Sequence, residues 1–433
     1  MNITRRQILQ TGAALAATGV GRAANDRIQI GIIGCGARSH EIMEALKKVP
    51  GTAMVGVTDA YKGRLERAVD RIGSTAKVYK NYKEILGDKS IDAVVIATPD
   101  HWHKTMVMDA VNAGKDVYCE KPLTFRSSEG PEIIAAAQKN NRIVQVGSQG
   151  VSSETAQKAR EMIRSGKLGK VTMIRAAYNR NTASGAWIYP IPPDATPETV
   201  NWDMFLGPAP KKPYSNERFF RWRCYKDYSG GIATDLFVHL CTTIHYLMDA
   251  KMPSRAVAMG QLYRWTESRE VPDTLNGLLE YPEGFAVNLS STFNNQTTAE
   301  GGFQFLGTEG AITMGGGMTF YPERAREDNR WIVESWPKRL EDDYYKDPQV
   351  RKIELGEGVP AKDTKPVQFR GDSDIDTPHL ANWAESIRTR KANWEDASAG
   401  HHAAACAHMV NMSVETGRSV EWDFSKDDIK KRS

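Results

Sequence analysis

The feature that most constrains the fold is a run of β-branched residues that leads directly into a glycine turn. Residues 27–33 read RIQIGII, and Gly34-Cys35-Gly36 follow at once. Apolar residues then recur at helical spacing from Ile42 to Val49. A strand, a glycine turn and a helix in this order let the backbone approach a pyrophosphate, which free N–H groups at the helix N-terminus can bind. The third glycine of a GxGxxG motif is replaced by Ser39, which is still small enough for close packing of helix and strand.

An acidic residue follows the next predicted strand at the spacing that dinucleotide-binding folds use. Residues 53–58 form this strand, and Asp59 stands at its end. A carboxylate there can hold the ribose hydroxyls and would repel a 2′-phosphate, so Asp59 favours NAD over NADP. Lys62 and Arg64 follow closely, which keeps NADP possible. The alternative is that Asp59 only caps the next helix.

Strands and helices alternate through the rest of the first 150 residues. Further strands are predicted at residues 78–79, 91–97, 116–119 and 143–147, with helices of about ten residues or fewer between them. Such alternation is typical of a doubly wound parallel sheet. We therefore predict a Rossmann domain over residues 25–150.

Polar residues gather where these strands end. Thr98 to His103 follow one strand, and Glu120-Lys121-Pro122 follow another. Ligands of such sheets bind outside the carboxyl ends of the strands, although a surface ion pair is the alternative for Glu120 and Lys121. The predicted cofactor contacts are Gly34, Cys35, Gly36, Ala37, Arg38, Asp59, Thr98, Pro99, His101, Trp102, His103, Glu120, Lys121 and Gln149.

The pattern changes after residue 150. A helix at residues 154–165 and a strand at 171–178 precede a proline-rich loop at residues 185–215. Alternating segments between residues 256 and 313 predict an open, mostly antiparallel sheet, so residues 151–433 are expected to form a second α/β domain. The uncovered face of such a sheet commonly joins subunits, which predicts a homo-oligomer, dimer or tetramer. Residues 321–370 are charged and are expected to form an irregular insertion or arm.

A helix in this second half carries a carboxylate and an imidazole. Gly230-Gly231 precede the helix, and Asp235 and His239 lie one turn apart on it. A carboxylate beside an imidazole can orient it and make it a better general base, although such pairs are more often structural. The last helix also contains His401, His402, Cys406 and His408, but their angles scatter and no carboxylate joins them at ligand spacing, so no metal is expected.

The N-terminus has the pattern of a secretion signal. Arg5-Arg6 precede a mildly apolar stretch at residues 11–20, and small residues end it near position 24. This order resembles a twin-arginine signal at residues 1–24, which predicts export to the periplasm. The alternative is a membrane anchor, but the stretch is shorter than a membrane span requires, so no stable membrane insertion is expected.

Composition excludes a nucleic-acid partner. The chain has 433 residues with a formal net charge of +4, and charged residues make up 25%. Such a balance gives no electrostatic reason to bind nucleic acid. The five cysteines form no CxxC pair. A chain that folds in the reducing cytosol before export is not expected to need a disulfide scaffold.

Taken together, these motifs resemble the Gfo/Idh/MocA family, which includes glucose–fructose oxidoreductase and inositol dehydrogenase. The resemblance rests on motifs in one order along the chain: Gly34-Cys35-Gly36, Thr98-Pro99-Asp100-His101-Trp102-His103, Glu120-Lys121-Pro122, Gly230-Gly231 with Asp235 and His239, and Thr308-Glu309-Gly310. It implies a Rossmann domain followed by an α/β domain with an open sheet. It also implies that Lys121, Asp235 and His239 are the catalytic groups.

The resemblance implies an NAD(P)-dependent oxidoreductase that removes hydride from a carbohydrate hydroxyl carbon. His239, held by Asp235, is expected to accept the hydroxyl proton, and Lys121 to stabilise the developing alkoxide. Expected substrate contacts are Tyr178, Arg221, Trp222, Tyr225 and His239, although aromatic residues could equally be core.

Export separates the enzyme from the cytosolic nicotinamide pool, which raises two alternatives. One is a glycosidase with tightly bound NAD, similar to exported N-acetylgalactosaminidases of this family, which oxidises C3 transiently with no net redox change. The other is a sugar-binding or scaffold protein that the cofactor only stabilises. The intact set of Lys121, Asp235 and His239 favours ordinary oxidoreductase chemistry.

Overall fold

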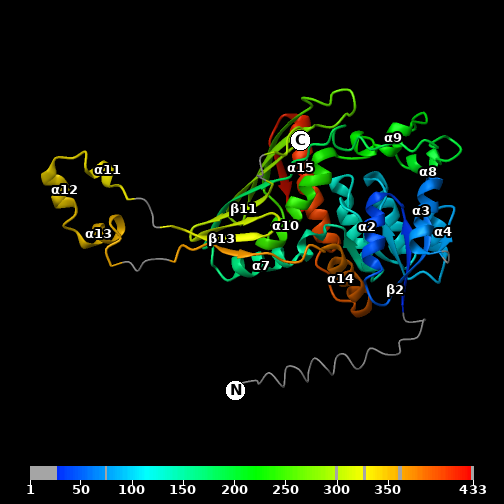
Figure 1. The fold of residues 1–433 in the computed structure, drawn as a ribbon, viewed down its shortest axis with the longest axis horizontal. Helices are drawn as coiled ribbons and strands as arrows, with labels where there is room; N and C mark the ends of the chain where they lie inside the picture. The colour runs from blue at the N-terminus through cyan, green and yellow to red at the C-terminus, as the bar shows by residue number, and fades with distance from the viewer. Residues whose placement is uncertain (1–26, 74–75, 298–300, 325–327, 359–362, 431–433) are drawn as a thin grey trace, which may run out of the picture.

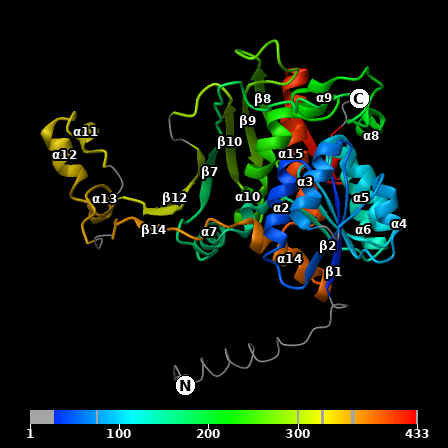
Figure 2. The same ribbon diagram turned by 45° about the vertical axis from the view of Figure 1, so that its right-hand side comes forward.

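The chain folds into two sheet-based domains that pack side by side, with a small helical lobe set apart from them (Figures 1 and 2). The computed structural model describes residues 27–73, 76–297, 301–324, 328–358 and 363–430. The segment predicted as a twin-arginine signal, residues 1–24, lies outside the described residues.

The first domain is the predicted doubly wound parallel sheet. Six strands have the order β3-β2-β1-β4-β5-β6 in the described chain, and every pair is parallel. β1, β4 and β5 are almost wholly buried, as a sheet covered on both faces requires. The strands are β1 (Ile28–Ile33), β2 (Thr52–Thr58), β3 (Lys77–Val78), β4 (Ala93–Ile96), β5 (Asp116–Cys119) and β6 (Val144–Val146).

Helices cover both faces of this sheet and create two separate apolar cores. One core includes residues of α4, α5 and α6, and the other includes residues of α2 and α3 together with the later helix α14 (Asp376–Thr389). Trp383 of α14 is fully buried in the second core. A helix from near the C-terminus therefore completes the N-terminal domain. The other helices are α2 (Ala37–Leu46), α3 (Lys62–Ile72), α4 (Tyr82–Gly87), α5 (His103–Asn112) and α6 (Gly130–Lys139).

The second domain is built on a larger, mostly antiparallel sheet, as predicted. Its ten described strands have the order β14-β13-β12-β11-β7-β10-β9-β8-β15-β16, and only β7 and β10 run parallel. The strands are β7 (Val171–Ala177), β8 (Arg255–Gln261), β9 (Thr274–Tyr281), β10 (Phe285–Thr292), β11 (Gly302–Gly307), β12 (Gly310–Met314), β13 (Met318–Pro322), β14 (Val367–Phe369), β15 (Val420–Asp423) and β16 (Asp428–Ile429).

One face of this sheet is covered and the other is open. Residues of β9 alternate between buried and exposed, which is typical of a sheet with one face on the core. The covering helices are α7 (Glu154–Arg164), α10 (Val238–Met248) and α15 (Ala397–Thr416). On the open face, Met259 is 78% exposed and Leu278 is 59% exposed. Large apolar side chains are thus exposed to solvent on this face of the sheet.

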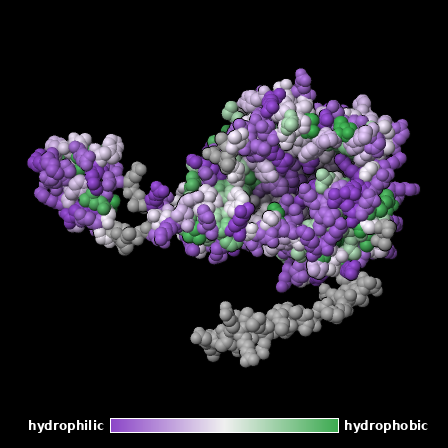
Figure 3. All heavy atoms as spheres, viewed as in Figure 1, coloured by the Kyte–Doolittle hydropathy of each residue, from purple (hydrophilic) through white to green (hydrophobic). Residues whose placement is uncertain are grey.

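Two segments contain more regular structure than their composition suggested. The proline-rich loop at residues 185–215 includes the short helix α8 (Trp202–Leu206), which the side chain of Asn201 caps. Residues 321–370 contain α11 (Arg330–Val333), α12 (Lys338–Tyr344) and α13 (Pro348–Glu354), which form the lobe seen apart from the body in Figure 3. Within the part of the chain described, no helix combines the length and the hydropathy that crossing a bilayer requires.

Candidate active site

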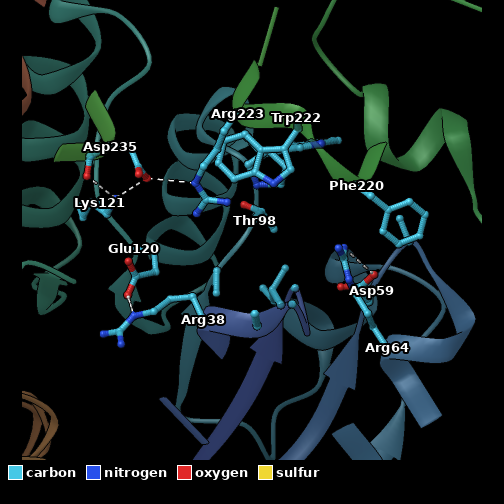
Figure 4. A pocket seen from close by; sticks show the side chains of 18 of the residues that line it. Arg38, Asp59, Arg64, Thr98, Glu120, Lys121, Phe220, Trp222, Arg223 and Asp235 are labelled. Atoms are coloured by element: carbon cyan, nitrogen blue, oxygen red, sulfur yellow. Dashed lines mark hydrogen bonds and ion pairs between the residues drawn. The ribbon is translucent and has the colours of Figure 1, made fainter. Parts of the chain in front are cut away.

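A cavity crosses the boundary between the two domains. Its volume is about 530 Å³, within the usual range for small-molecule sites. It lies above the carboxyl ends of β1, β2, β4 and β5, and residues 178–239 of the second domain form its other wall. Figure 4 shows Asp59 and Arg64 at one end and the group of Lys121, Asp235 and Arg223 at the other.

The glycine turn is shaped to receive a diphosphate. Gly34 has φ +86°, and a Cβ there would lie 2.6 Å from the carbonyl oxygen of Ala97, so only glycine fits without strain. Gly36 is the N-cap of α2, and no side chain caps that helix. The first N–H groups of α2 are therefore free to donate to a bound anion. Gly36 also leaves room beside the turn, because a Cβ there would meet nothing closer than 3.9 Å.

The carboxylate of Asp59 is fixed at the end of β2. Its oxygens accept hydrogen bonds from the backbone N–H groups of Cys35, at 2.7 Å, and Tyr61, at 2.8 Å. Arg64 lies 3.9 Å from the same carboxylate, with its guanidinium over the ring of Phe220. Asp59 thus stands at the end of β2, with a cation beside its carboxylate.

Lys121 and Asp235 meet at the opposite end. The Lys121 Nζ donates to Asp235 Oδ1 at 2.8 Å and to the Asp235 backbone oxygen at 2.8 Å. Both side chains are about 90% buried. Asp235 lies in a π-helical turn, Ala233–Phe237, just before α10, and such turns occur frequently at functional sites.

Asp235 does not form the hydrogen-bonded pair with His239 that the sequence suggested. Its carboxylate accepts hydrogen bonds from Lys121, from Arg223 Nε at 3.0 Å and from Trp187 Nε1 at 3.2 Å. No hydrogen bond joins Asp235 to His239 within the described residues, because two cations and an indole already occupy the carboxylate. Burial opposes ionisation, but Lys121 and Arg223 hold the pKa of Asp235 far below its usual range.

His239 nevertheless lines the same end of the cavity. Burial and the nearby charge of Lys121 hold the pKa of His239 well below its ordinary value. The imidazole is therefore neutral at neutral pH and can accept a proton.

Glu120 does not pair with its neighbour Lys121. Its Oε1 accepts from Arg38 Nε at 2.9 Å, and Arg38 also contacts Asp376 of α14 at 2.6 Å. A Cβ at Gly147 would lie 2.5 Å from the Glu120 carboxylate. Glu120 is therefore a fixed link between the glycine turn and the end of β5.

Most of the predicted cofactor contacts line the cavity. They are Gly34, Gly36, Ala37, Arg38, Asp59, Thr98, Pro99, Trp102, Glu120, Lys121 and Gln149. Cys35, His101 and His103 do not line it, because they are buried behind the wall. The ring nitrogens of His103 lie 2.6 Å from the carbonyl oxygen of Pro122 and 2.9 Å from that of Thr98. His103 thus holds two strand ends together.

The predicted substrate contacts are only partly in the cavity. Tyr178, Trp222 and His239 line it, whereas Arg221 and Tyr225 do not. Arg221 points to Glu217 at 3.2 Å and to the Tyr189 carbonyl oxygen at 3.0 Å, and Tyr225 stacks under Arg218. Lining residues that the sequence did not predict include Arg180, Tyr189 and Arg223. Arg223 stands two positions from Arg221 in the sequence RWRCY, where only the local backbone decides which arginine faces inward.

The histidines of α15 are drawn together by a residue outside that helix. His402 Nε2 lies 3.0 Å from Asp427 Oδ1, and His401 Nε2 lies 3.6 Å from Asp427 Oδ2. These three side chains could share an ion. Asp427 lies 25 positions after His402 in the chain, so spacing within one helix could not predict this contact.

Comparison with known proteins decides the family. The sequence model of the oxidoreductase family with an NAD-binding Rossmann fold, GFO/IDH/MocA, matches residues 28–148, and the model of the GFO/IDH/MocA C-terminal domain matches residues 156–313. The chain belongs to the Gfo/Idh/MocA family. The predicted fold class is thereby confirmed for both domains.

Inositol 2-dehydrogenase of Salmonella typhimurium (strain LT2) is a curated relative of this family member. It is 30% identical over 176 residues, which are 40% of this chain and 50% of the relative. The chain thus spans about half the length of the curated relatives it matches.

Solved structures extend the likeness in fold to most of the chain. An NAD binding oxidoreductase from Klebsiella pneumoniae has a TM-score of 0.65 at 20% identity, and levoglucosan dehydrogenase in complex with NADH and levoglucosan has 0.66 at 17%. Each comparison covers 91% of this chain and 99% of the other.

Proposed function

We propose that this Gfo/Idh/MocA protein is an NAD-dependent oxidoreductase that acts on a hydroxyl of a sugar or sugar derivative. The observation that carries the proposal is the meeting of Lys121, Asp235 and His239 at one end of a cavity whose other end has a glycine turn and Asp59. Curated relatives named inositol 2-dehydrogenase, and a neighbour solved with NADH and levoglucosan, support it.

The cavity residues fit a dinucleotide. The free N–H groups of α2 would hold its diphosphate, and Asp59 its adenosine ribose hydroxyls. The carboxylate favours NAD, while Arg64 beside it keeps NADP as a weaker possibility. When bound, the nicotinamide supplies the hydride acceptor.

The chain's own residues would handle the proton and the charge. A neutral ring nitrogen of His239 can accept the hydroxyl proton, because the low pKa keeps that imidazole unprotonated. The ammonium of Lys121 would stabilise negative charge that develops on the substrate oxygen. Asp235 holds that ammonium in place through two hydrogen bonds and keeps it from turning away. Asp235 therefore orients Lys121, whereas the sequence suggested that it would orient His239.

One experiment tests the function directly. Purified full-length protein is denatured to release nicotinamide, and intact protein loaded with NAD is mixed with free sugars while the absorbance of reduced nicotinamide is followed. Reduction by a free sugar supports the proposal. Failure to bind NAD, or cleavage of chromogenic glycosides without reduction by any free sugar, would overturn it, and the second result would establish the glycosidase.

We further propose that the protein is exported through the twin-arginine pathway and works in the periplasm. The support is sequence alone, namely Arg5-Arg6 and the mildly apolar stretch that follows. A fusion of residues 1–24 to a reporter should appear in the periplasm, and replacement of both arginines by lysine should retain the reporter in the cytosol. Equal export of both fusions would contradict this.

The open sheet is proposed to join copies of this chain. Exposed Val257, Met259 and Leu278 on β8 and β9 form an apolar surface of the kind that subunit contacts cover. Light scattering should show a dimer or tetramer that Met259→Glu and Leu278→Glu together dissociate. A monomeric wild-type protein would refute this arrangement.

A further inference from the structure

The substrate end of the cavity is unusually rich in positive charge. Lys121, Arg180 and Arg223 line it, together with the neutral His239. Asp235 pairs with two of these cations, and the carboxylate of Glu120, which neighbours Lys121 in the sequence, also lines the cavity. Figure 4 shows Arg223 on the same side as Asp235 and Lys121, well away from Asp59.

Not all of these cations are fully paired within the protein. The carboxylate of Asp235 forms ion pairs with Lys121 and with the Nε of Arg223. The two terminal nitrogens of Arg223 have no hydrogen-bond partner in the described chain. Arg180 lies over the Tyr178 ring, 5.2 Å from its centroid, and pairs with no carboxylate of the described residues. Arginine stays charged at any physiological pH, so both groups are standing donors to a ligand.

Most other acidic groups near the cavity contact a different cation. Glu120, Glu41 and Asp376 all pair with Arg38, and Asp59 lies at the opposite end. Asp100 is 3% exposed and lies behind the wall, and burial raises its pKa to about 7 despite the opposing charges of Arg223 and Lys121. Three cations, Lys121, Arg180 and Arg223, thus face Asp235 and Asp100. The cations exceed these carboxylates by one charge when Asp100 is ionised and by two when it is protonated.

We propose that the substrate is a sugar acid, with a carboxylate that binds between Arg180 and Arg223. This inference rests on the proposed oxidoreductase function and adds a substrate class to it. A planar carboxylate can take two parallel N–H donors from a guanidinium. A neutral sugar would leave the Arg180 guanidinium in this partly enclosed site without a carboxylate at ion-pair distance. Trp222, whose ring lies 4.2 Å from the Arg223 guanidinium carbon, stiffens that side chain from one face.

Neither arginine is placed to serve the diphosphate of the cofactor. That group is expected at the α2 N-terminus, beside Gly34 and Gly36. Arg180 follows β7, on the wall formed by the second domain, where Tyr178 and Tyr189 also line the cavity. A ligand that contacts Arg180 would therefore lie on the substrate side.

The test compares matched sugars on NAD-loaded full-length protein. Galacturonate and glucuronate are compared with galactose and glucose, with the methyl esters of the two acids, and with hexose 6-phosphates. We expect kcat/KM for the better acid to exceed that of its neutral parent and of its ester by about 10- to 100-fold, the size of a charge-assisted hydrogen-bond pair. Arg180→Gln should bring this ratio close to one. Arg164→Gln is the matched control, since Arg164 lies on α7 outside the cavity and pairs with Asp249, and it should keep the ratio.

Each other outcome overturns the proposal in its own way. If neutral sugars or esters react as well as the acids, the positive charge of Arg180 and Arg223 does not bind a substrate carboxylate, while the proposed function would stand. A preference for the phosphates would replace the carboxylate with a different anion. A loss of NAD affinity in Arg180→Gln, with the acid ratio unchanged, would assign Arg180 to the cofactor.

A binding measurement separates this proposal from the proposed function. If no sugar reduces the bound NAD, calorimetric titration of the loaded protein with galacturonate and glucuronate still shows whether the site binds a sugar acid. Binding that Arg180→Gln weakens by about 10-fold or more, and Arg164→Gln does not, supports the anionic site without the redox activity. No binding, or equal binding by both variants, refutes it.

Discussion

The Nζ of Lys121 lies 2.8 Å from Oδ1 of Asp235, although 114 positions separate the two residues in the chain. This contact joins the end of β5 in the first domain to the π-helical turn before α10 in the second. Arg223 completes a buried cluster of two cations and one carboxylate. Removal of one partner from such a cluster leaves an uncompensated buried charge, so each member matters for the position of the others.

Lys121→Met should lower turnover by at least about 100-fold, because it removes the charge that stabilises the developing alkoxide. NAD should remain bound, since the glycine turn and Asp59 are untouched. Steady-state kinetics and fluorescence titration of the cofactor measure the two effects. Lys104→Met, which alters a surface ion pair with Glu132, is the control and should keep full activity. Equal activity in both variants would remove Lys121 from the mechanism.

His239→Ala should lower kcat/KM by about 100- to 10,000-fold, the contribution of a general base. The pH profile of the wild type gives a second readout. Because burial and Lys121 lower the pKa of His239, its unprotonated form persists below pH 6.5, the ordinary histidine value. The acidic limb of kcat/KM should therefore fall below that pH. An acidic limb above it, or an active variant, would show that another group accepts the proton.

Asp59→Ala should weaken NAD binding by about 10-fold, the effect of losing a charged hydrogen-bond acceptor. The change should weaken NADP binding less, because the carboxylate would no longer repel a 2′-phosphate beside Arg64. Titration with both cofactors measures the ratio. Asp70→Ala, on the exposed side of α3 near Arg67, should leave both affinities unchanged. Equal weakening of both cofactors would mean that Asp59 only shapes the loop.

Gly34→Ala should destabilise the first domain by about 1–3 kcal/mol, because its backbone has a positive φ and the new Cβ would collide with Ala97. The cofactor should also bind more weakly, since the turn must shift. Gly87→Ala is the matched control, because a Cβ there meets nothing within 4 Å. Thermal unfolding with and without NAD compares the two. An unfolding temperature that is the same in both variants would contradict the tight fit at Gly34.

Stability should depend on pH through the buried His379. Its ring nitrogens lie 2.7 Å from Ser152 Oγ and 2.9 Å from the Val146 carbonyl oxygen, and burial lowers its pKa to about 4. The unfolded chain therefore binds a proton at this residue below pH 6.5 while the folded chain does not, so this stabilisation is lost as pH falls. The free energy of unfolding of the wild type minus that of His379→Gln should shrink by about 1–2 kcal/mol between about pH 7.5 and about pH 5. Urea unfolding at both pH values measures it, and a constant difference would contradict the neutral buried imidazole.

Much of the first domain could be predicted because its signals are local. The run from residue 28 to 33, the turn at Gly34 and the acid at Asp59 are each read within a few neighbours, and the structure places all three as expected. The positions of His101, His103, Arg221 and Tyr225 outside the cavity lining have a different origin. Whether a polar side chain faces a cavity or a backbone carbonyl depends on parts of the fold that are distant in the chain, as the contacts of His103 with Pro122 and Thr98 show.

The sequence by itself determined the order of the two domains, the glycine turn and the candidates for reactive side chains, because periodicity and turn chemistry act over short stretches of chain. Only the tertiary structure decided that Asp235 binds Lys121 and Arg223 rather than His239, and that Arg180 and Arg223 face the cavity. Ion pairs form between whichever charges the packing of two domains brings within a few ångströms, and spacing along one helix does not reveal that distance.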